Sequence, residues 1–247
     1  MEFLSIYWWR LLVSVVISYL LGSFSFAVIF SKMSKDHKDV REMGSGNAGF
    51  TNVLRTVGVV PAVFTFVFDC LKGIIAVFIT MWIFNLPFDN GAIEALAENV
   101  RFEYNVYGKY LAGAFCVLGH SFPVFFGFRG GKGITTMAGI LLVLDPVPWM
   151  LVLTLAVWLL FFLSTKIISV GSVASTVAIV VWNFVITFFF VYKPSLGTDM
   201  PLRLSYVITT TVIMFFIGLF VAIMHRENIK RIIRGEEKKI SVKKNKS

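Results

Sequence analysis

Two polar, glycine-rich segments separate long apolar runs in this chain, and they hold most of the side chains that could do chemistry. The first extends from Gly44 to Arg55 and the second from Gly119 to Gly133. Both combine backbone N–H groups with hydroxyls, amides or cationic side chains, beside stretches apolar enough for a lipid bilayer. This combination favours a phosphate ligand, because turns rich in N–H groups and cationic side chains bind phosphate oxygens.

The first segment offers several kinds of hydrogen-bond donor to an anion. Its glycines permit turns that residues with a Cβ resist, and successive N–H groups in such a turn form a nest for an anion. Arg55 adds a planar guanidinium that binds phosphate through two parallel hydrogen bonds. Close helix packing through small residues would explain the glycines but not the polar residues. We expect six residues of this segment to contact substrate: Ser45, Gly46, Asn47, Thr51, Asn52 and Arg55.

The second segment places a lysine among glycines at the start of an apolar run. Gly130, Gly131, Lys132 and Gly133 look like a nucleotide-binding P-loop, but a P-loop has a hydroxyl residue directly after its lysine, where Gly133 stands here. Flexible backbone amides and an ammonium group at a helix start still favour an anion. The alternative is that Lys132 lies at the end of a span and its side chain only reaches toward the aqueous phase, without binding an anion. The presence of the first segment favours the anion site.

Polar residues inside or beside apolar runs are the next candidates. His120 lies within a run, where a histidine either shapes a site or bonds another helix. His225 and Asn228 are three residues apart, so they share one face of a helix after the last run. Asp69 and Lys72 are also three apart and are expected to neutralise each other inside the membrane. We favour a structural role for that pair, with support of a nearby site as the alternative.

Composition identifies an all-α integral membrane protein. Of its 247 residues 57% are hydrophobic and 15% charged, and the mean hydropathy is +0.80, whereas a soluble domain has about 25% charged residues. Strong apolar runs indicate helices, because the signal of a membrane β-barrel alternates and is weak. Membrane topology explains the net charge of +9, so the bilayer, and not nucleic acid, is the expected partner. Cys70 and Cys116 lie in apolar runs, and we predict no disulfide, metal or cofactor.

The apolar runs predict about seven membrane-spanning helices. Five spans are clear: Leu11–Phe30, Val59–Leu86, Tyr110–Phe128, Val170–Val191 and Leu204–Met224. The stretch Ile134–Leu163 is interrupted by two prolines within residues 145–148, so it is either one broken span or two short ones. Basic residues gather in segments 31–55, 129–132 and 225–247, which the positive-inside rule assigns to the cytoplasm. The stretch Ile134–Leu163, which follows the basic segment 129–132, must therefore cross the membrane and return.

This topology places the N-terminus outside and the C-terminus in the cytoplasm. The external segment Pro87–Lys109 is acidic. We divide the chain into a membrane domain, residues 1–224, and a basic cytoplasmic tail, residues 225–247. Isoleucines near helical spacing make the tail either an interfacial amphipathic helix or a plain orientation-setting segment. All the segments that could bind an anion then lie on the cytoplasmic side, which predicts a single site there.

These motifs resemble those of the bacterial acyl-phosphate:glycerol-3-phosphate acyltransferases, the PlsY family. The matching pieces follow the family's order over nearly the whole chain: Gly44–Gly58, Asp69–Gly73, Gly119–Gly133, His225–Ile229 and Gly235–Glu237. The resemblance implies seven membrane helices and a cytoplasmic active site in the bacterial inner membrane. It also implies transfer of a fatty acyl group from acyl phosphate to the 1-hydroxyl of glycerol 3-phosphate. The products would be lysophosphatidic acid and phosphate, with no metal or other cofactor.

The resemblance also implies site residues. Its catalytic positions correspond to Ser45, Arg55, Lys132, His225 and Asn228. A serine between the fifth and sixth spans belongs to the site as well, and we choose Ser169 over Ser172. With it, the expected substrate-binding residues are Gly46, Asn47, Thr51, Asn52, His120, Gly130, Gly131, Gly133 and Ser169. The chain departs from the family pattern at Phe50, where alanine is usual, and at Arg129, where lysine is common.

The residue types suit this chemistry. An acyl phosphate already carries a good leaving group, so the protein needs no nucleophile but must hold two anions together. We hypothesise that a substrate phosphate oxygen accepts the hydroxyl proton, with a protein base as the alternative. The competing function is a phosphate or organic-anion transporter, whose polar residues should reach mid-membrane in several spans. A lipid-binding scaffold would leave both glycine-rich segments unexplained.

Overall fold

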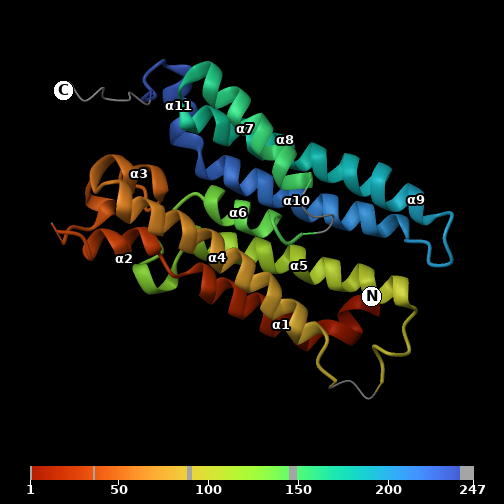
Figure 1. Cartoon of the computed structure of the whole chain (residues 1–247). Helices are drawn as coiled ribbons and strands as arrows, with labels where there is room; N and C mark the ends of the chain where they lie inside the picture. Colours follow the sequence, from red (N-terminus) through yellow and green to blue (C-terminus); the bar gives the residue numbers. More distant parts are fainter. Residues whose placement is uncertain (1, 36, 88–90, 145–148, 240–247) are drawn as a thin grey trace.

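The computed structural model is built from helices (Figure 1), and it describes residues 2–35, 37–87, 91–144 and 149–239. The α-helices are α1 (Glu2–Gly22), α2 (Phe26–Lys32), α3 (Phe50–Thr56), α4 (Val59–Phe84), α5 (Glu98–Ser121), α6 (Ile134–Leu141), α7 (Trp149–Thr165), α8 (Ile168–Val185), α9 (Lys193–Ser195), α10 (Leu204–Met224) and α11 (Arg226–Ile233). Two 3-10 helices, η1 (Val40–Glu42) and η2 (Val124–Phe126), and a π-helical segment, η3 (Ile186–Tyr192), lie between them. The predicted all-helical class is confirmed.

Within the described residues, five stretches of helix are long and apolar enough to cross a membrane, and each overlaps one predicted span. They are Phe3–Lys32, Val59–Phe84, Glu98–Phe126, Ile168–Ser195 and Leu204–Met224. The interrupted stretch forms two helices, α6 with 8 residues and α7 with 17, and not one broken helix. The segment Asp145–Pro148, where the prediction placed the interruption, lies outside the described residues, as does Ile240 of the tail.

Two helices begin earlier than predicted. α1 starts at Glu2, nine residues before the expected Leu11, and α5 starts at Glu98. The second half of the predicted external segment Pro87–Lys109 is therefore helix, and the prediction was wrong because charged residues lower the hydropathy there. Glu103 is fully buried and accepts hydrogen bonds from the backbone N–H and the guanidinium of Arg203, at 2.6 and 2.8 Å. This pairing lets a carboxylate lie inside the helix bundle.

Small residues let the central helices approach one another closely. A methyl group built on Gly119 of α5 would overlap the backbone carbonyl of Tyr19 in α1. One built on Gly139 of α6 would overlap the carbonyl of Cys70 in α4. Helices in lipid associate through such van der Waals contacts, because lipid tails are as apolar as the side chains they would replace. α1, α4, α5 and α6 thereby form one packed unit.

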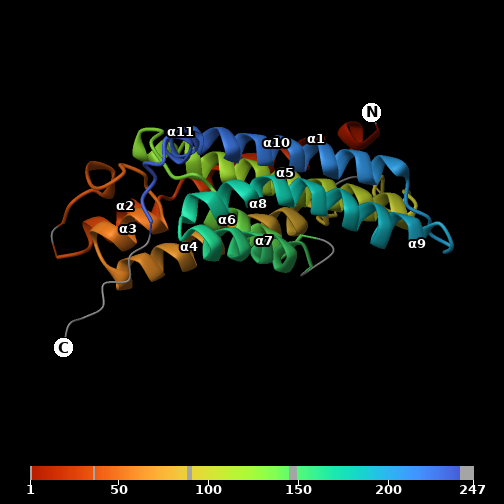
Figure 2. The ribbon, with the colours of Figure 1, turned by 90° about the horizontal axis from the view of Figure 1, so that it is seen from above.

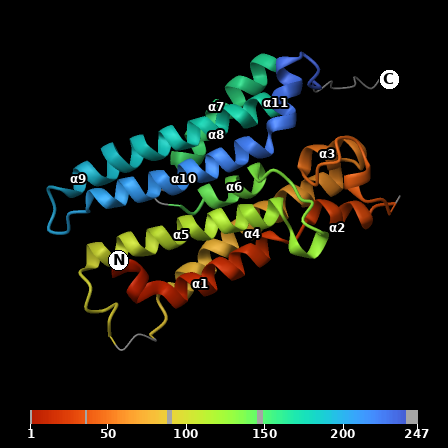
Figure 3. The same cartoon turned by 180° about the vertical axis from the view of Figure 1, so that it is seen from behind.

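The polar segments meet at one end of the bundle. Figures 1 and 3 show α2, α3 and α11 gathered at the same end, whereas the N-terminus and α9 lie at the opposite end. The view in Figure 2 shows the long helices running along the axis between these ends. α7, α8 and α10 pack together and join the first unit through α5 and α6. Segments far apart in the sequence are thus brought side by side at the end that carries α11.

Candidate active site

Four polar side chains from separate parts of the chain form one hydrogen-bonded cluster. Lys132 Nζ donates to Asn228 Oδ1, and Asn228 Nδ2 donates to Ser169 Oγ at 2.8 Å. Glu237 Oε1 accepts from Asn228 Nδ2 at 2.7 Å and from Ser169 Oγ at 2.5 Å. Three of the predicted site residues therefore lie together. Ser172, the alternative to Ser169, is buried one turn further along α8.

The N-terminal turns of three helices converge on this cluster. Lys132 closely precedes α6, Ser169 lies in the first turn of α8, and Asn228 lies in the first turn of α11. Each helix start leaves backbone N–H groups without helical partners and carries partial positive charge. Gly133 makes the turn into α6 with φ of +87°, a left-handed conformation that favours glycine. The local backbone thus concentrates positive potential where the polar side chains meet.

Two arginines flank the cluster. Arg231 Nε donates to Glu237 Oε2 at 2.6 Å, and Arg55 Nη2 donates to the backbone carbonyl of Lys238 at 3.4 Å. Both guanidinium groups lie near enough to Lys132 to lower its pKa. Arg55 is exposed, so its remaining N–H donors are open to a ligand. Three cations therefore surround one carboxylate.

The ammonium group of Lys132 is easier to deprotonate than that of an ordinary lysine. Burial and the positive charges of Arg231 and Arg55 together lower the pKa of Lys132 to about 8, against the opposing effect of the Glu237 carboxylate. Lys132 is mostly cationic at neutral pH. A bound anion would favour the charged form, because an opposite charge nearby raises the pKa of a lysine.

His225 stands between α10 and α11 and is 4% exposed. Its Nδ1 lies 2.8 Å from the backbone oxygen of Val221, which can only accept, so we assign the imidazole proton to Nδ1 and the lone pair to Nε2. Burial lowers the pKa of His225 to about 4, and Lys132 contributes to that shift. The imidazole is therefore neutral at physiological pH, and Nε2 can accept a hydrogen bond from a substrate hydroxyl.

Asn52 organises the first polar loop, residues 39–56 between α2 and α4, from inside. Its side chain is 3% exposed, donates to the carbonyls of Val40 and Met43 at 3.0 and 2.9 Å, and accepts from the N–H of Ser45 at 3.0 Å. We expected Asn52 to bind substrate, but both of its amide hydrogens are used within the loop. Ser45 and Gly46 lie exposed on the turn that Asn52 supports. Among the described residues, no hydrogen bond joins the Ser45 side chain to the Lys132 cluster.

The remaining predicted residues of the first loop lie on or beside α3. Asn47 precedes the helix and Thr51 lies in its first turn, and both are half-buried. Arg55 lies in the last turn of α3. The chain then turns at Gly58, whose φ of +133° separates α3 from α4.

The first loop packs against the second polar loop, residues 122–133 between α5 and α6. The guanidinium of Arg41 donates to the carbonyl of Phe126 at 2.5 Å. The carbonyl of Ala48 lies so close to Gly131 that a methyl group built on this glycine would overlap it. Because Gly131 directly precedes Lys132, the loop with the predicted serine and arginine packs beside the catalytic candidate lysine.

Gly130 and Gly131 use their N–H groups within the fold. They donate to the carbonyls of Ser121 and His120, at 3.1 Å each. We expected these glycines to offer N–H groups to an anion, but the structure uses them to fold the loop back onto the end of α5. Their lack of side chains serves close packing, since a methyl group on either would overlap an atom of His120. The turn that these two bonds hold leads directly into Lys132.

Asp69, Lys72 and His120 form a buried cluster beneath that loop. Lys72 Nζ lies 2.8 Å from Asp69 Oδ1 and 2.9 Å from His120 Nδ1. It also donates to the carbonyls of Gly22 and Phe24, at 3.1 and 2.9 Å. These partners offset the cost of placing a charge in the membrane. Lys72 thereby ties the break between α1 and α2 to α4 and α5, and His120 lies behind the second loop.

Comparison with known proteins gives a consistent result. The family model described as glycerol-3-phosphate acyltransferase matches residues 12–235. The glycerol-3-phosphate acyltransferase of Staphylococcus saprophyticus is 33% identical over 231 residues, which cover 93% of this chain and 98% of that protein. The enzyme of the same name from Trichormus variabilis is 36% identical, with 93% and 91% covered. The chain belongs to the glycerol-3-phosphate acyltransferase family.

Solved structures agree with this membership. The glycerol 3-phosphate form of PlsY, an integral membrane glycerol 3-phosphate acyltransferase, is 30% identical and superposes with a TM-score of 0.70, covering 94% of this chain and 96% of that one. The lysophosphatidic acid form is 29% identical, with a TM-score of 0.68. The predicted family, the acyltransferase class and the integral membrane character are confirmed.

The sequence of this acyltransferase did not reveal the centre of its polar cluster. Glu237 accepts hydrogen bonds from Ser169, Asn228 and Arg231, yet in the sequence it was noted only as part of a tail motif. Arg231 was one of several basic tail residues. The available signal was that Glu237 lies two residues after Gly235. Gly235 has a φ of +71°, and at this glycine the chain turns after the end of α11. Within the described ranges, no group of three His, Cys, Asp or Glu residues could hold a metal ion.

Proposed function

We propose that this acyltransferase moves a fatty acyl group from acyl phosphate to the 1-hydroxyl of glycerol 3-phosphate, giving lysophosphatidic acid and phosphate. The observation that carries the proposal is the cluster of Lys132, Ser169 and Asn228, flanked by Arg55 and Arg231. Both substrates are phosphate-bearing anions. Cations and preorganised hydrogen-bond donors hold such groups together and offset the charge that develops in the reaction.

The active site lies on the cytoplasmic side of the bacterial inner membrane in this proposal. Five helical stretches are long and apolar enough to span a membrane among the described residues, and the proposal adds α6 and α7 as one outward and one inward crossing, with the N-terminus outside. The helices α2, α3 and α11 lie at the same end (Figure 1), and their sequences and the adjoining segments carry many of the basic residues, which supports this orientation. α11 is short and amphipathic, with Ile229, Ile232 and Ile233 among basic residues, and it lies along the cytoplasmic surface.

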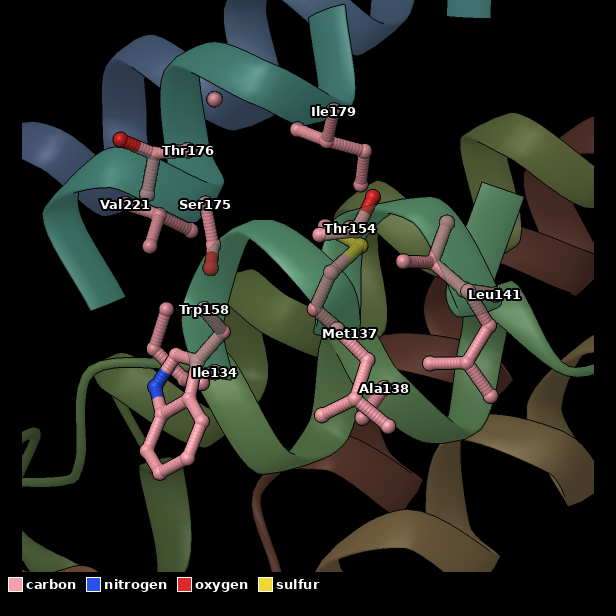
Figure 4. Close-up of a pocket in the computed structure, with 13 residues that line it drawn as sticks. Ile134, Met137, Ala138, Leu141, Thr154, Trp158, Ser175, Thr176, Ile179 and Val221 are labelled. Carbon is pink, nitrogen blue, oxygen red and sulfur yellow. The ribbon is translucent and has the colours of Figure 1, made fainter. Parts of the chain in front are cut away.

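An apolar groove beside the polar cluster suits the acyl chain. It lies between α6, α7, α8 and α10 with a cavity volume of about 90 Å³, and Figure 4 shows Met137 and Ile179 directed toward each other across it. Its lining includes Ile134, two residues after Lys132, and Val221, one turn before His225. Placing the chain here sets its acyl carbonyl beside the cations and removes the methylenes from water.

The proposed reaction uses no protein nucleophile. The hydroxyl oxygen of glycerol 3-phosphate attacks the acyl carbonyl carbon, the bond from that carbon to the phosphate oxygen breaks, and the electron pair leaves with phosphate. Lys132 and Arg55 stabilise the charge on the phosphate groups. His225, with a pKa of about 4, is a weak base and orients the hydroxyl through Nε2. A phosphate oxygen of the substrates therefore takes the proton, as the residue types suggest.

Purified enzyme in lipid nanodiscs tests the proposal. With acyl phosphate and radiolabelled glycerol 3-phosphate, we expect labelled lysophosphatidic acid and one phosphate per product, and no product with acyl-CoA. Asn228→Ala should abolish most of the transfer, because it removes a partner of Lys132 and of Ser169. Lys230→Ala is the matched control, since Lys230 is exposed on the same helix. Equal use of acyl-CoA, or full activity of Asn228→Ala, would contradict the proposal.

The transporter alternative gains no support from the deep polar residues. Asp69, Lys72 and His120 bond one another and two backbone carbonyls, so they do not line an open path. Uptake of radiolabelled glycerol 3-phosphate into sealed vesicles, without acylation, is the result that would favour a transporter.

A further inference from the structure

The buried cluster of Asp69, Lys72 and His120 has a defined pattern of donors and acceptors. Lys72 Nζ makes hydrogen bonds with the carbonyls of Gly22 and Phe24 and with His120 Nδ1. An ammonium group has three hydrogens and can only donate. Asp69 Oδ1 lies 2.8 Å from Nζ and supplies the opposite charge, but neither oxygen of this carboxylate is in hydrogen-bonding geometry. The three hydrogens of Lys72 therefore match the two carbonyls and His120 Nδ1, which are the acceptors in hydrogen-bonding geometry.

This count fixes the tautomer of His120. A nitrogen that accepts from an ammonium group must carry its lone pair, so Nδ1 has no hydrogen and the neutral ring carries its proton on Nε2. His225 has the opposite arrangement, because its Nδ1 faces the carbonyl of Val221. The two buried histidines of the described chain thus differ in which ring nitrogen holds the proton.

The Nε2 side of His120 faces the junction of the two polar loops. A methyl group built on Gly131 would overlap both His120 Nε2 and the backbone carbonyl of Ala48, so both atoms lie close to the Cα of this glycine. Ala48 is 1% exposed and His120 is 5% exposed. A buried carbonyl needs a donor, and water has little access here. A ring N–H at Nε2 is the matching group.

We propose that Lys72 and Asp69 hold His120 with its proton on Nε2, so that this N–H keeps the first and second loops together and places Lys132 for catalysis. His120 is then a positioning residue, and the intramembrane ion pair sets its tautomer. The inference rests on the proposed acyl transfer for its kinetic consequence, but the tautomer itself does not depend on that function.

Nitrogen NMR of ¹⁵N-histidine-labelled enzyme in nanodiscs tests the tautomer directly, since protonated and lone-pair ring nitrogens have separate shifts. We expect His120 with Nε2–H and His225 with Nδ1–H in the same sample. Lys72→Met should change the His120 pattern, with Nδ1–H appearing, and leave His225 unchanged. Nδ1–H on His120 in the wild-type enzyme, or no change in Lys72→Met, would overturn the proposal.

Two conservative variants test the positioning role. His120→Gln can place an amide N–H near the Nε2 position, whereas His120→Asn reaches only the Nδ1 position. We expect the Gln variant to keep kcat/KM for glycerol 3-phosphate within about threefold and the Asn variant to lose about tenfold or more, since a buried hydrogen bond is lost. Thermal unfolding of both variants is the control, because a purely structural role would lower stability and activity in parallel. Equal activities would refute the role of Nε2–H.

The two outcomes separate this inference from the proposed function. If wild-type enzyme transfers no acyl group, the proposed reaction fails while the NMR result still decides the tautomer. If wild-type enzyme is active and the Asn variant matches the Gln variant, only the positioning role of His120 fails.

Discussion

Raising the pH should remove activity through a single group, Lys132. Its pKa of about 8 lies in the range where a membrane enzyme can be assayed. One pH unit above that value roughly a tenth of the lysine stays cationic, and two units above roughly a hundredth. We therefore expect kcat/KM for glycerol 3-phosphate to fall about tenfold per pH unit above 8. The substrate does not contribute to this fall, because a phosphate monoester has its second pKa near 6.

Two variants identify the group that titrates. In Lys132→Arg the guanidinium stays charged far above pH 10, so the alkaline fall should disappear even if the plateau is lower. Glu237→Gln should shift the fall to lower pH, because the carboxylate of Glu237 raises the pKa of Lys132. The two variants should therefore move the alkaline fall of kcat/KM in opposite directions along the pH scale.

The assay measures initial rates of lysophosphatidic acid formation in nanodiscs between pH 6 and 10. Enzyme held at the highest pH is returned to pH 7 and must recover its activity, which separates titration from denaturation. An unchanged alkaline midpoint in Lys132→Arg would refute the reasoning, because another group would then control the loss.

Four further substitutions have expected outcomes. Gly131→Ala should raise KM for glycerol 3-phosphate by about tenfold or more, because the methyl group would overlap His120 and displace the loop; kinetics at fixed acyl phosphate measure this. Ser169→Ala should lower kcat/KM by about tenfold, whereas Ser172→Ala should leave it nearly unchanged, since only the first serine joins the polar cluster. Glu103→Leu should lower the free energy of unfolding by about 3 kcal/mol, seen as a lower Tm, because its arginine partner and a backbone N–H lose their acceptor.

The spans were predictable where apolar runs end at charges. The predicted span Leu204–Met224 coincides with α10, which follows Arg203 and precedes His225. The start of α5 was not predictable in the same way, because Glu103 lowers the local hydropathy. Its partner Arg203 lies 100 residues away in the sequence, and only the folded arrangement brings the two charges together. A charged residue lowers the hydropathy of its own segment, whether or not the fold pairs it with an opposite charge from another segment.

The site was predictable in its members more than in its contacts. Positive segments on one side of the membrane and matching motifs brought Lys132, Ser169 and Asn228 into one group before any geometry was known. Whether a glycine N–H is free depends on which carbonyls the fold places near it, and the sequence carries no trace of that for Gly131. The same holds for Glu237, because an acidic residue in a basic tail shows no periodicity that separates a buried carboxylate from a solvated one.

The charge balance of the site has a further consequence for catalysis. Lys132, Arg55 and Arg231 carry three positive charges, Glu237 carries one negative charge, and His225 is neutral. Burial and this positive excess hold the pKa of Lys132 down until a phosphate group binds and favours the ammonium form. The alkaline midpoint of kcat, which reports the bound complex, should therefore lie above that of kcat/KM, which reports the free enzyme. Equal midpoints in the two profiles would mean that no substrate anion approaches Lys132.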